Sequence, residues 1–276
     1  MIDPLTFHEK FSLKDFDFQY NLRVKRPDYE ATVIPNWVER SKVARGKLDT
    51  IVDQRYGVGV GEKQKLDIFR VKDPNAPTLV YFHGGYWQRG DKSIYSFLAS
   101  SFNSEGVNFI TVGYDLCPTV SITHISNQAR EALVFIWQNA RSLGVNRDQI
   151  TVMGHSAGGH ITQMMMGTNW VEFSNGLPAD LVTAGIPISP LSYLEPVRLT
   201  EALNAGIGMT AAEAESQSPM VNHPPLTNAP QLVAVGGNET DEFHRQAQMY
   251  VDAFSSGDRS MEIYICLLYT SDAADE

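Results

Sequence analysis

The feature that most constrains the fold of this chain is a regular alternation of short apolar runs with segments of helical periodicity. Six runs of four or five residues are rich in aliphatic and β-branched side chains. Continuous runs of this length are typical of strands that are buried on both faces of a parallel sheet. The runs are Thr78–Phe82, Asn108–Val112, Ile150–Met153, Gly185–Ile188, Gln231–Val235 and Met261–Ile265.

The segments between these runs predict helices, because their apolar residues recur at helical spacing. Alternating strands and helices indicate an α/β fold, with a mostly parallel central sheet and helices on both faces. Two earlier strand-like segments flank a glycine-rich turn and predict an antiparallel hairpin before the parallel part. The predicted helices are Ser93–Ser104, Ile125–Ser142, Ala157–Gly167 and Asp241–Ser255, and the hairpin strands are Thr50–Tyr56 and Lys65–Arg70.

Length and charge limit the classes of protein to which the chain can belong. Its 276 residues suit one large α/β domain, which we expect over residues 1–265. The net charge of −10 argues against nucleic acid or an anionic membrane as a partner. No apolar run approaches the ~20 residues that cross a bilayer, and no signal core is present at the start. We therefore expect a cytoplasmic protein that acts on a small molecule, with a homodimer as an option.

The two cysteines, Cys117 and Cys266, make neither a disulfide framework nor a cysteine-rich zinc site. Low cysteine content also fits a reducing compartment. We expect no metal and no cofactor.

A nucleophile motif follows the third predicted strand. The residues Gly154-His155-Ser156-Ala157-Gly158 fit the pattern G-x-S-x-G and lie between an apolar strand and a helix. This context is what the motif requires, because its serine occupies a strained strand-to-helix turn. The start of the helix directs N–H groups and a partial positive charge at the site. Ser156 is therefore the predicted nucleophile.

Two histidines flank this serine, and both raise the alternative of a base or a metal ligand. His155 is adjacent to Ser156 in the chain and is expected to point away from the top of the turn. His160 lies one helical turn further on and is expected to pack or to cap.

A candidate oxyanion hole follows the first run, at His83-Gly84-Gly85-Tyr86-Trp87. Glycines allow backbone N–H groups to approach a ligand closely, and such donors stabilise a developing oxyanion by roughly 3–4 kcal/mol each. The expected donors are the N–H of Gly84 or Gly85 and that of Ala157, with His83 as a structural residue that holds the loop. Tyr86 and Trp87 are expected to line the entrance and to suit an aromatic substrate, and a core position for the tryptophan is the alternative.

The acid of a catalytic triad should follow the fifth run, because triads of this arrangement run serine, acid, histidine along the chain. Glu239 is nearest to the end of that strand. Asp241 is the alternative, although it could instead cap the following helix. Its position after the strand therefore predicts Glu239 as the triad acid, and Asp241 stays open as the alternative acid.

The base should follow the sixth run, where the sequence carries no histidine. The chain has seven histidines, and the last is His244 on the helix that follows the acid. Residues 266–276 resemble a translated transposon adapter from DNA sequencing libraries. We therefore expect a non-native tail there, and we expect the catalytic histidine and the last helix of the fold to be missing from this chain.

These motifs together resemble the kynurenine formamidase (arylformamidase) family of α/β-hydrolases. The resemblance extends to about Ile265, and His83–Gln88 is similar to that family's H-G-G-x-W motif. The segment that begins at Glu239 resembles the one that carries the family's acid. The resemblance implies an α/β-hydrolase fold and hydrolysis of N-formyl-kynurenine to kynurenine and formate, in tryptophan breakdown.

Two alternatives to this function stay open at the level of the sequence. A carboxylesterase for small esters would share every site residue with an aryl formamide hydrolase. A non-catalytic binding module on the same fold would keep the pocket without the reaction. The absent histidine also predicts that this particular chain is inactive.

Overall fold

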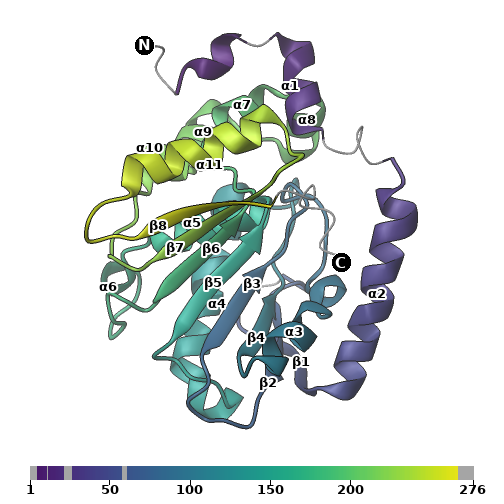
Figure 1. Ribbon diagram of the computed structural model, residues 1–276, viewed down its shortest axis with the longest axis vertical. Coiled ribbons are helices and arrows are strands. Elements are labelled where there is room, and N and C mark those ends of the chain that lie inside the picture. The colour runs from purple at the N-terminus through teal and green to yellow at the C-terminus, as the bar shows by residue number, and fades with distance from the viewer. Residues whose placement is uncertain (1–4, 11, 22–26, 58–60, 267–276) are drawn as a thin grey trace.

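The computed structural model describes residues 5–10, 12–21, 27–57 and 61–266. Its centre is an eight-stranded sheet with the strand order β1-β2-β4-β3-β5-β6-β7-β8 (Figure 1). The first two strands pair antiparallel and β2 pairs antiparallel with β4, whereas every pairing from β4 to β8 is parallel. The strands are β1 (Asp49–Arg55), β2 (Lys65–Arg70), β3 (Thr78–Phe82), β4 (Asn108–Val112), β5 (Ile150–His155), β6 (Ala184–Ile188), β7 (Gln231–Gly236) and β8 (Met261–Cys266).

This sheet confirms the predicted fold class and all six apolar runs as strands. All five residues of β3 and all five of β4 are buried, because both strands lie inside the sheet with helices over each face. The hairpin of β1 and β2 is confirmed as antiparallel.

Helices cover both faces of the sheet (Figure 1). The α-helices are α1 (Leu13–Tyr20), α2 (Tyr29–Lys47), α3 (Leu98–Ser104), α4 (Ile122–Leu143), α5 (Ala157–Met166), α6 (Trp170–Phe173), α7 (Glu195–Leu199), α8 (Glu201–Ile207), α9 (Ala211–Ser216), α10 (Pro219–Asn222) and α11 (Asp241–Phe254), and the short 3₁₀ helices are η1 (Phe7–Lys10) and η3 (Lys92–Tyr95).

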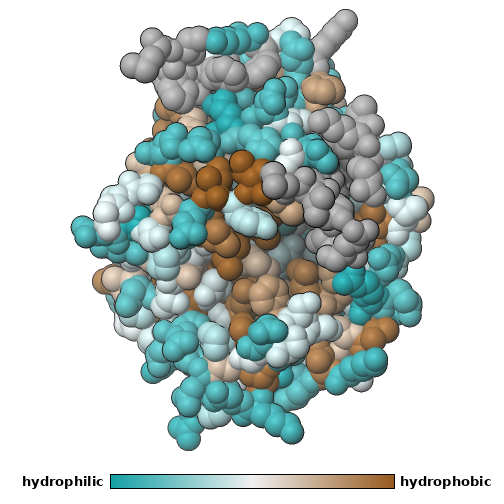
Figure 2. All heavy atoms as spheres, viewed as in Figure 1, coloured by the Kyte–Doolittle hydropathy of each residue, from teal (hydrophilic) through white to brown (hydrophobic). Residues whose placement is uncertain are grey.

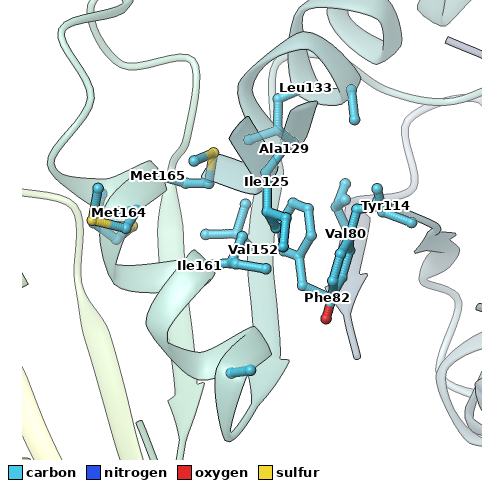
Figure 3. Packing of buried hydrophobic residues seen from close by; sticks show 14 of the residues in the cluster. Val80, Phe82, Tyr114, Ile125, Ala129, Leu133, Val152, Ile161, Met164 and Met165 are labelled. Carbon is cyan, nitrogen blue, oxygen red and sulfur yellow. The ribbon is translucent and has the colours of Figure 1, made fainter. Parts of the chain in front are cut away.

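The core divides into two layers because alternate residues of each strand face opposite sides. On one side, α4 and α5 pack against β3 and β5, and Figure 3 shows Ile125 and Ile161 meeting Val80 and Val152. On the other side, α2, η3 and α3 pack against the same strands, with Trp37 at the centre. The helix α11 packs on β7 and β8.

The predicted helix Ser93–Ser104 is wrong in one respect, since it is two elements, η3 and α3. The cause of the break is the side chain of Ser41 on α2, which is distant in the sequence. Its hydroxyl donates to the carbonyl oxygen of Ile94 (2.6 Å) and accepts the N–H of Phe97 (3.0 Å). A backbone N–H that is bonded to a side chain is not available to a helix.

The last two strands carry exposed apolar side chains, among them Leu232 and Ile265. Figure 2 shows apolar side chains gathered in the middle of the face seen in Figure 1, with polar side chains around them. Residue Cys266 ends β8, and the rest of the predicted non-native tail, residues 267–276, lies outside the described residues. Among the helices that the structure describes, none has the length and apolar character that a membrane crossing requires.

Candidate active site

Ser156 lies at the turn between β5 and α5, which confirms the strand–turn–helix context of the motif. Its φ of 56° is in the left-handed region, which is strained for a residue with a side chain. The turn is held because the N–H of Ser156 donates to the carbonyl oxygen of Ile188 (2.8 Å) at the end of the neighbouring strand β6. The serine is thus fixed at the carboxyl edge of the parallel strands, where α/β folds bind ligands.

The glycines of the motif are required by close backbone packing. A Cβ on Gly158 would lie 1.9 Å from the carbonyl oxygen of Phe82, and one on Gly154 would lie 2.2 Å from the carbonyl oxygen of Gly158. Both distances are far below van der Waals contact, so β3, β5 and α5 approach one another as closely as backbones can. The same approach brings the end of β3 beside the serine.

The loop after β3 lies directly against the nucleophile. A Cβ on Gly84 would meet the carbonyl oxygen of His155 at 2.9 Å and Cβ of Ser156 at 3.3 Å. Gly85 has a φ of 120°, and Tyr86 and Trp87 both have positive φ values despite their side chains. This strained loop therefore lies against the nucleophile, and its role as an oxyanion hole stays a prediction.

His83 holds that loop in place. Its ring is fully buried between Tyr95 and Tyr114, with ring centroids 5.8 and 4.2 Å away. Burial lowers the pKa of His83 to about 4, so the ring is neutral at pH 7. Its Nδ1 lies 2.9 Å from the carbonyl oxygen of Gly84 and must donate to it, because a carbonyl only accepts. Since N–H and C=O of a trans peptide point in opposite directions, the N–H of Gly85 points away from this histidine.

Glu239 lies just after β7, and it is 7% exposed. Its Oε1 accepts a hydrogen bond from Oγ of Ser189 (2.8 Å), which follows β6. The serine, this link and the carboxylate thus stand at the ends of three adjacent parallel strands, β5, β6 and β7. Asp241 is exposed, and Thr240 rather than Asp241 is the N-cap of α11. This geometry favours Glu239 over Asp241 as a triad acid.

The helix α1 connects the two loops of the site, and no local pattern in the sequence predicts this connection. The hydroxyl of Tyr86 donates to the carbonyl oxygen of Tyr20 (2.5 Å), and Oγ1 of Thr240 donates to that of Gln19 (2.7 Å). The hydroxyl of Tyr20 also donates to Oε2 of the fully buried Glu242 (2.5 Å). These bonds attach the oxyanion-type loop and the start of α11 to the same turn of helix.

Ser156 opens into a cavity of about 230 Å³. The side chain of Tyr86 lines it, as predicted. The prediction for Trp87 is wrong: its side chain is fully buried and meets the ring of His160 edge-on, with centroids 5.2 Å apart. The alternative of a core position for this tryptophan is therefore confirmed. The cavity is lined by Asn21, Tyr29, Glu30, Ile34, Gly84, Gly85, Tyr86, Arg89, Gly90, Ile94, Tyr95, His155, Ser156 and Leu203.

The two histidines beside the serine have different surroundings. His155 is among the residues that line the cavity with Ser156, and the direction of its side chain stays a prediction. His160 packs in the core, as expected, and its Nε2 lies 2.7 Å from the carbonyl oxygen of Gln217, to which it donates. Burial lowers the pKa of His160 to about 4. Because the rings of His83 and His160 are both buried and already bonded to carbonyl groups, neither is placed to accept the serine proton.

A larger cavity of about 910 Å³ lies elsewhere on the molecule, with Asp115, His124 and Glu131 in its wall. It contains no predicted site residue, so the smaller cavity is the candidate active site. Within the described part of the chain, no three His, Cys, Asp or Glu side chains are grouped in a way that could hold a metal ion.

Several known proteins are similar to this chain in sequence. A family model described as BD-FAE matches residues 66–179. Kynurenine formamidase of Drosophila melanogaster is 30% identical over 242 residues, which cover 82% of this chain and 78% of that protein. Kynurenine formamidase of Salmo salar is 28% identical over 86% of this chain and 80% of its own length.

Solved structures with the same fold include esterases. A protein of Silicibacter sp. TM1040, provisionally described as a thioesterase, is 31% identical and has a TM-score of 0.72, covering 85% of this chain and 84% of that one. Esterase B of Lactobacillus rhamnosis, with a TM-score of 0.65 and 18% identity over 88% of this chain and 84% of its own, shares the fold.

Proposed function

The chain belongs to the kynurenine formamidase family of α/β-hydrolases, and we propose that its site is built to hydrolyse N-formyl-kynurenine to kynurenine and formate. The observation that carries the proposal is the contact of the Gly84 loop with Ser156 inside one cavity with aromatic walls. A nucleophile, backbone donors and a flat apolar surface are what an aryl formamide requires. The 30% identity to the Drosophila enzyme supports this choice of substrate.

The reaction follows from these parts. Oγ of Ser156 attacks the formyl carbon while its proton passes to a base, and the carbonyl oxygen becomes an oxyanion. The N–H groups of Gly85, or Gly84, and Ala157 donate to that oxygen. The C–N bond then breaks, and the arylamine leaves with the proton from the base. Water adds to the formyl-serine ester, and formate leaves as the serine is restored.

The triad acid in this proposal is Glu239, which would orient a histidine base and stabilise its charged form. The order of the motif places that histidine after β8, and no histidine follows His244 in the sequence. We propose that the 276-residue polypeptide has negligible turnover for this reason. The loss of one triad member typically lowers the rate by about 10⁴-fold.

The experiment compares two polypeptides. One is the 276-residue chain, and in the other the segment after Ile265 is replaced by the segment that follows the corresponding strand of the Drosophila relative. We expect formate release from N-formyl-kynurenine only with the second, and we expect Ser156→Ala to abolish it. Ser142→Ala, at an exposed serine near the end of α4, is the matched control. Turnover that survives Ser156→Ala would show that Ser156 is not the nucleophile, whereas binding without turnover in the second polypeptide would favour the binding module.

Ester or thioester hydrolysis is the second candidate, because the 31% identical structure is provisionally described as a thioesterase. The same serine and donors would act on an acyl ester. Hydrolysis of phenyl acetate without hydrolysis of the formamide would favour this alternative. Cell fractionation and light scattering would test the expected cytoplasmic location and homodimer.

A further inference from the structure

The cavity around Ser156 carries two opposite charges at its rim. Oε1 of Glu30 and Nη1 of Arg89 are 3.8 Å apart, and their side chains are 58% and 47% exposed. Glu30 lies in the first turn of α2, whereas Arg89 belongs to the loop after β3, so separate segments of the chain bring them together. Among the described residues that line this cavity, these two are the only ones of the Asp, Glu, Lys and Arg types.

The interior of the cavity is different from its rim. Ser156 and Tyr95 are each 7% exposed, and Ile94 and Leu203 add apolar surface beside them. The cavity therefore changes from a buried reactive end, through an aromatic and aliphatic middle, to an outer end where the described charged residues are Glu30 and Arg89. A ligand that matches it has a reactive group at one end, an apolar ring in the middle and both charges at the other.

We propose that Glu30 and Arg89 select substrates that carry an α-amino-acid group, an inference that rests on the proposed aryl formamide hydrolysis. The ammonium group of the substrate binds Glu30, and its carboxylate binds the guanidinium of Arg89. The planar guanidinium presents paired donors that suit a carboxylate. The 3.8 Å between Oε1 of Glu30 and Nη1 of Arg89 places an acidic and a basic group side by side, as the two charged groups of an α-amino acid are.

In this proposal, two parts of the cavity recognise two parts of the substrate. The interior binds the aryl formamide, and Glu30 and Arg89 at the rim bind the zwitterionic side chain of the aryl group. Simple neutral formamides and acetate esters use the interior alone, so the rim pair distinguishes N-formyl-kynurenine from them.

The experiment measures binding, because binding of the product requires no catalytic base. Four ligands are titrated calorimetrically into the 276-residue polypeptide at low salt: kynurenine, its decarboxylated amine, its deaminated acid, and 2-aminoacetophenone, which lacks both charged groups. We expect Arg89→Gln to lower the affinity for kynurenine and for the deaminated acid about five- to tenfold. The affinities for the other two ligands should stay within about twofold of the parent's. We expect Glu30→Gln to lower the affinity for kynurenine and for the decarboxylated amine by a similar factor and to leave the other two affinities unchanged.

The chain offers a matched control pair. Glu39 and Lys42 also form an ion pair on α2 (3.2 Å), are more exposed, and do not line the cavity. Glu39→Gln and Lys42→Gln should leave all four affinities unchanged. Because 2-aminoacetophenone binds only the interior, its unchanged affinity also shows that each variant is folded.

Two results would overturn the inference, and they differ in what they say about the proposed function. If both rim variants bind all four ligands as the parent does, or weaken all four equally, the rim does not read the amino-acid group, while aryl binding in the cavity still stands. If neither kynurenine nor 2-aminoacetophenone binds the parent, the inference and the proposed aryl formamide substrate fail together.

Discussion

Two fully buried histidines near the nucleophile, His83 and His160, should make the fold less stable in mild acid. Burial lowers the pKa of His83 and of His160 to about 4 from an ordinary value of 6.5. Each ring is fully buried and neutral in the folded chain, whereas in the unfolded chain it takes up a proton below pH 6.5. The unfolded state therefore binds more protons between pH 6.5 and pH 4, and the free energy of unfolding falls as the pH drops through that window.

The magnitude follows from the two pKa values of each ring. At pH 5, a shift from 6.5 to about 4 corresponds to about 2 kcal/mol for one fully buried histidine. The two together give a loss of about 4 kcal/mol between pH 8 and pH 5. This is a large share of the ~5–15 kcal/mol that holds a domain folded. Burial also lowers the pKa of the partly buried His223, which adds to the loss in the same direction.

Urea unfolding at pH 8 and at pH 5 measures the difference directly. His160→Gln keeps an amide that can donate to the carbonyl of Gln217 and removes one titrating ring, so its difference should shrink by about half. His124→Gln, at an exposed site on α4, is the matched control and should leave the difference unchanged. A His160→Gln variant with the full pH dependence of the parent would refute the reasoning, whatever its absolute stability.

Three further substitutions test the packing around the site. Gly158→Ala places a Cβ 1.9 Å from a backbone oxygen of β3 and should lower the free energy of unfolding by about 3 kcal/mol or more. Gly46→Ala in α2 is the control, because a Cβ there would meet nothing within 4 Å, and it should be neutral or stabilising. Soluble yield and thermal melts compare the two variants. Tyr20→Phe removes a buried bond to the carboxylate of Glu242 and should cost about 2–3 kcal/mol, or a fall of roughly 4–12 °C in Tm; an unchanged melt would contradict it. Ser156→Gly removes the strain of a side chain at a φ of 56°, so this variant should be more stable than Ser156→Ala by about 1 kcal/mol and should have the higher Tm. The reverse order of the two Tm values would show that the turn is not strained.

Local patterns were enough to predict the sheet and the nucleophile. The central strands are recognisable because a buried parallel strand must be apolar throughout, and this is a property of about five consecutive residues. Ser156 was recognisable because its turn needs glycines at fixed offsets, and the structure shows the close contacts that exclude a Cβ there. The helices α4 and α11 were predictable from the same kind of local periodicity.

Side-chain direction in the strained loops was not predictable in this way. The prediction for Trp87 fails at a residue with a positive φ, an angle that few residues with side chains adopt. In an ordinary extended or helical segment, alternation or periodicity gives the direction of a side chain. At a positive φ that rule fails, and only the surrounding packing decides. The break between η3 and α3 likewise depends on Ser41, a residue more than fifty positions away from Phe97.

The attachment of α1 to α11 has a consequence for how the protein is made. Tyr20 and its partner Glu242 are 222 residues apart in the chain. A ribosome that adds about 5–20 residues per second needs on the order of 10–45 s to pass from one to the other. For that time the first helix has been synthesised but the surface that anchors it has not. One wall of the cavity, which Asn21 helps to form, therefore leaves the ribosome well before the segment that holds it in place.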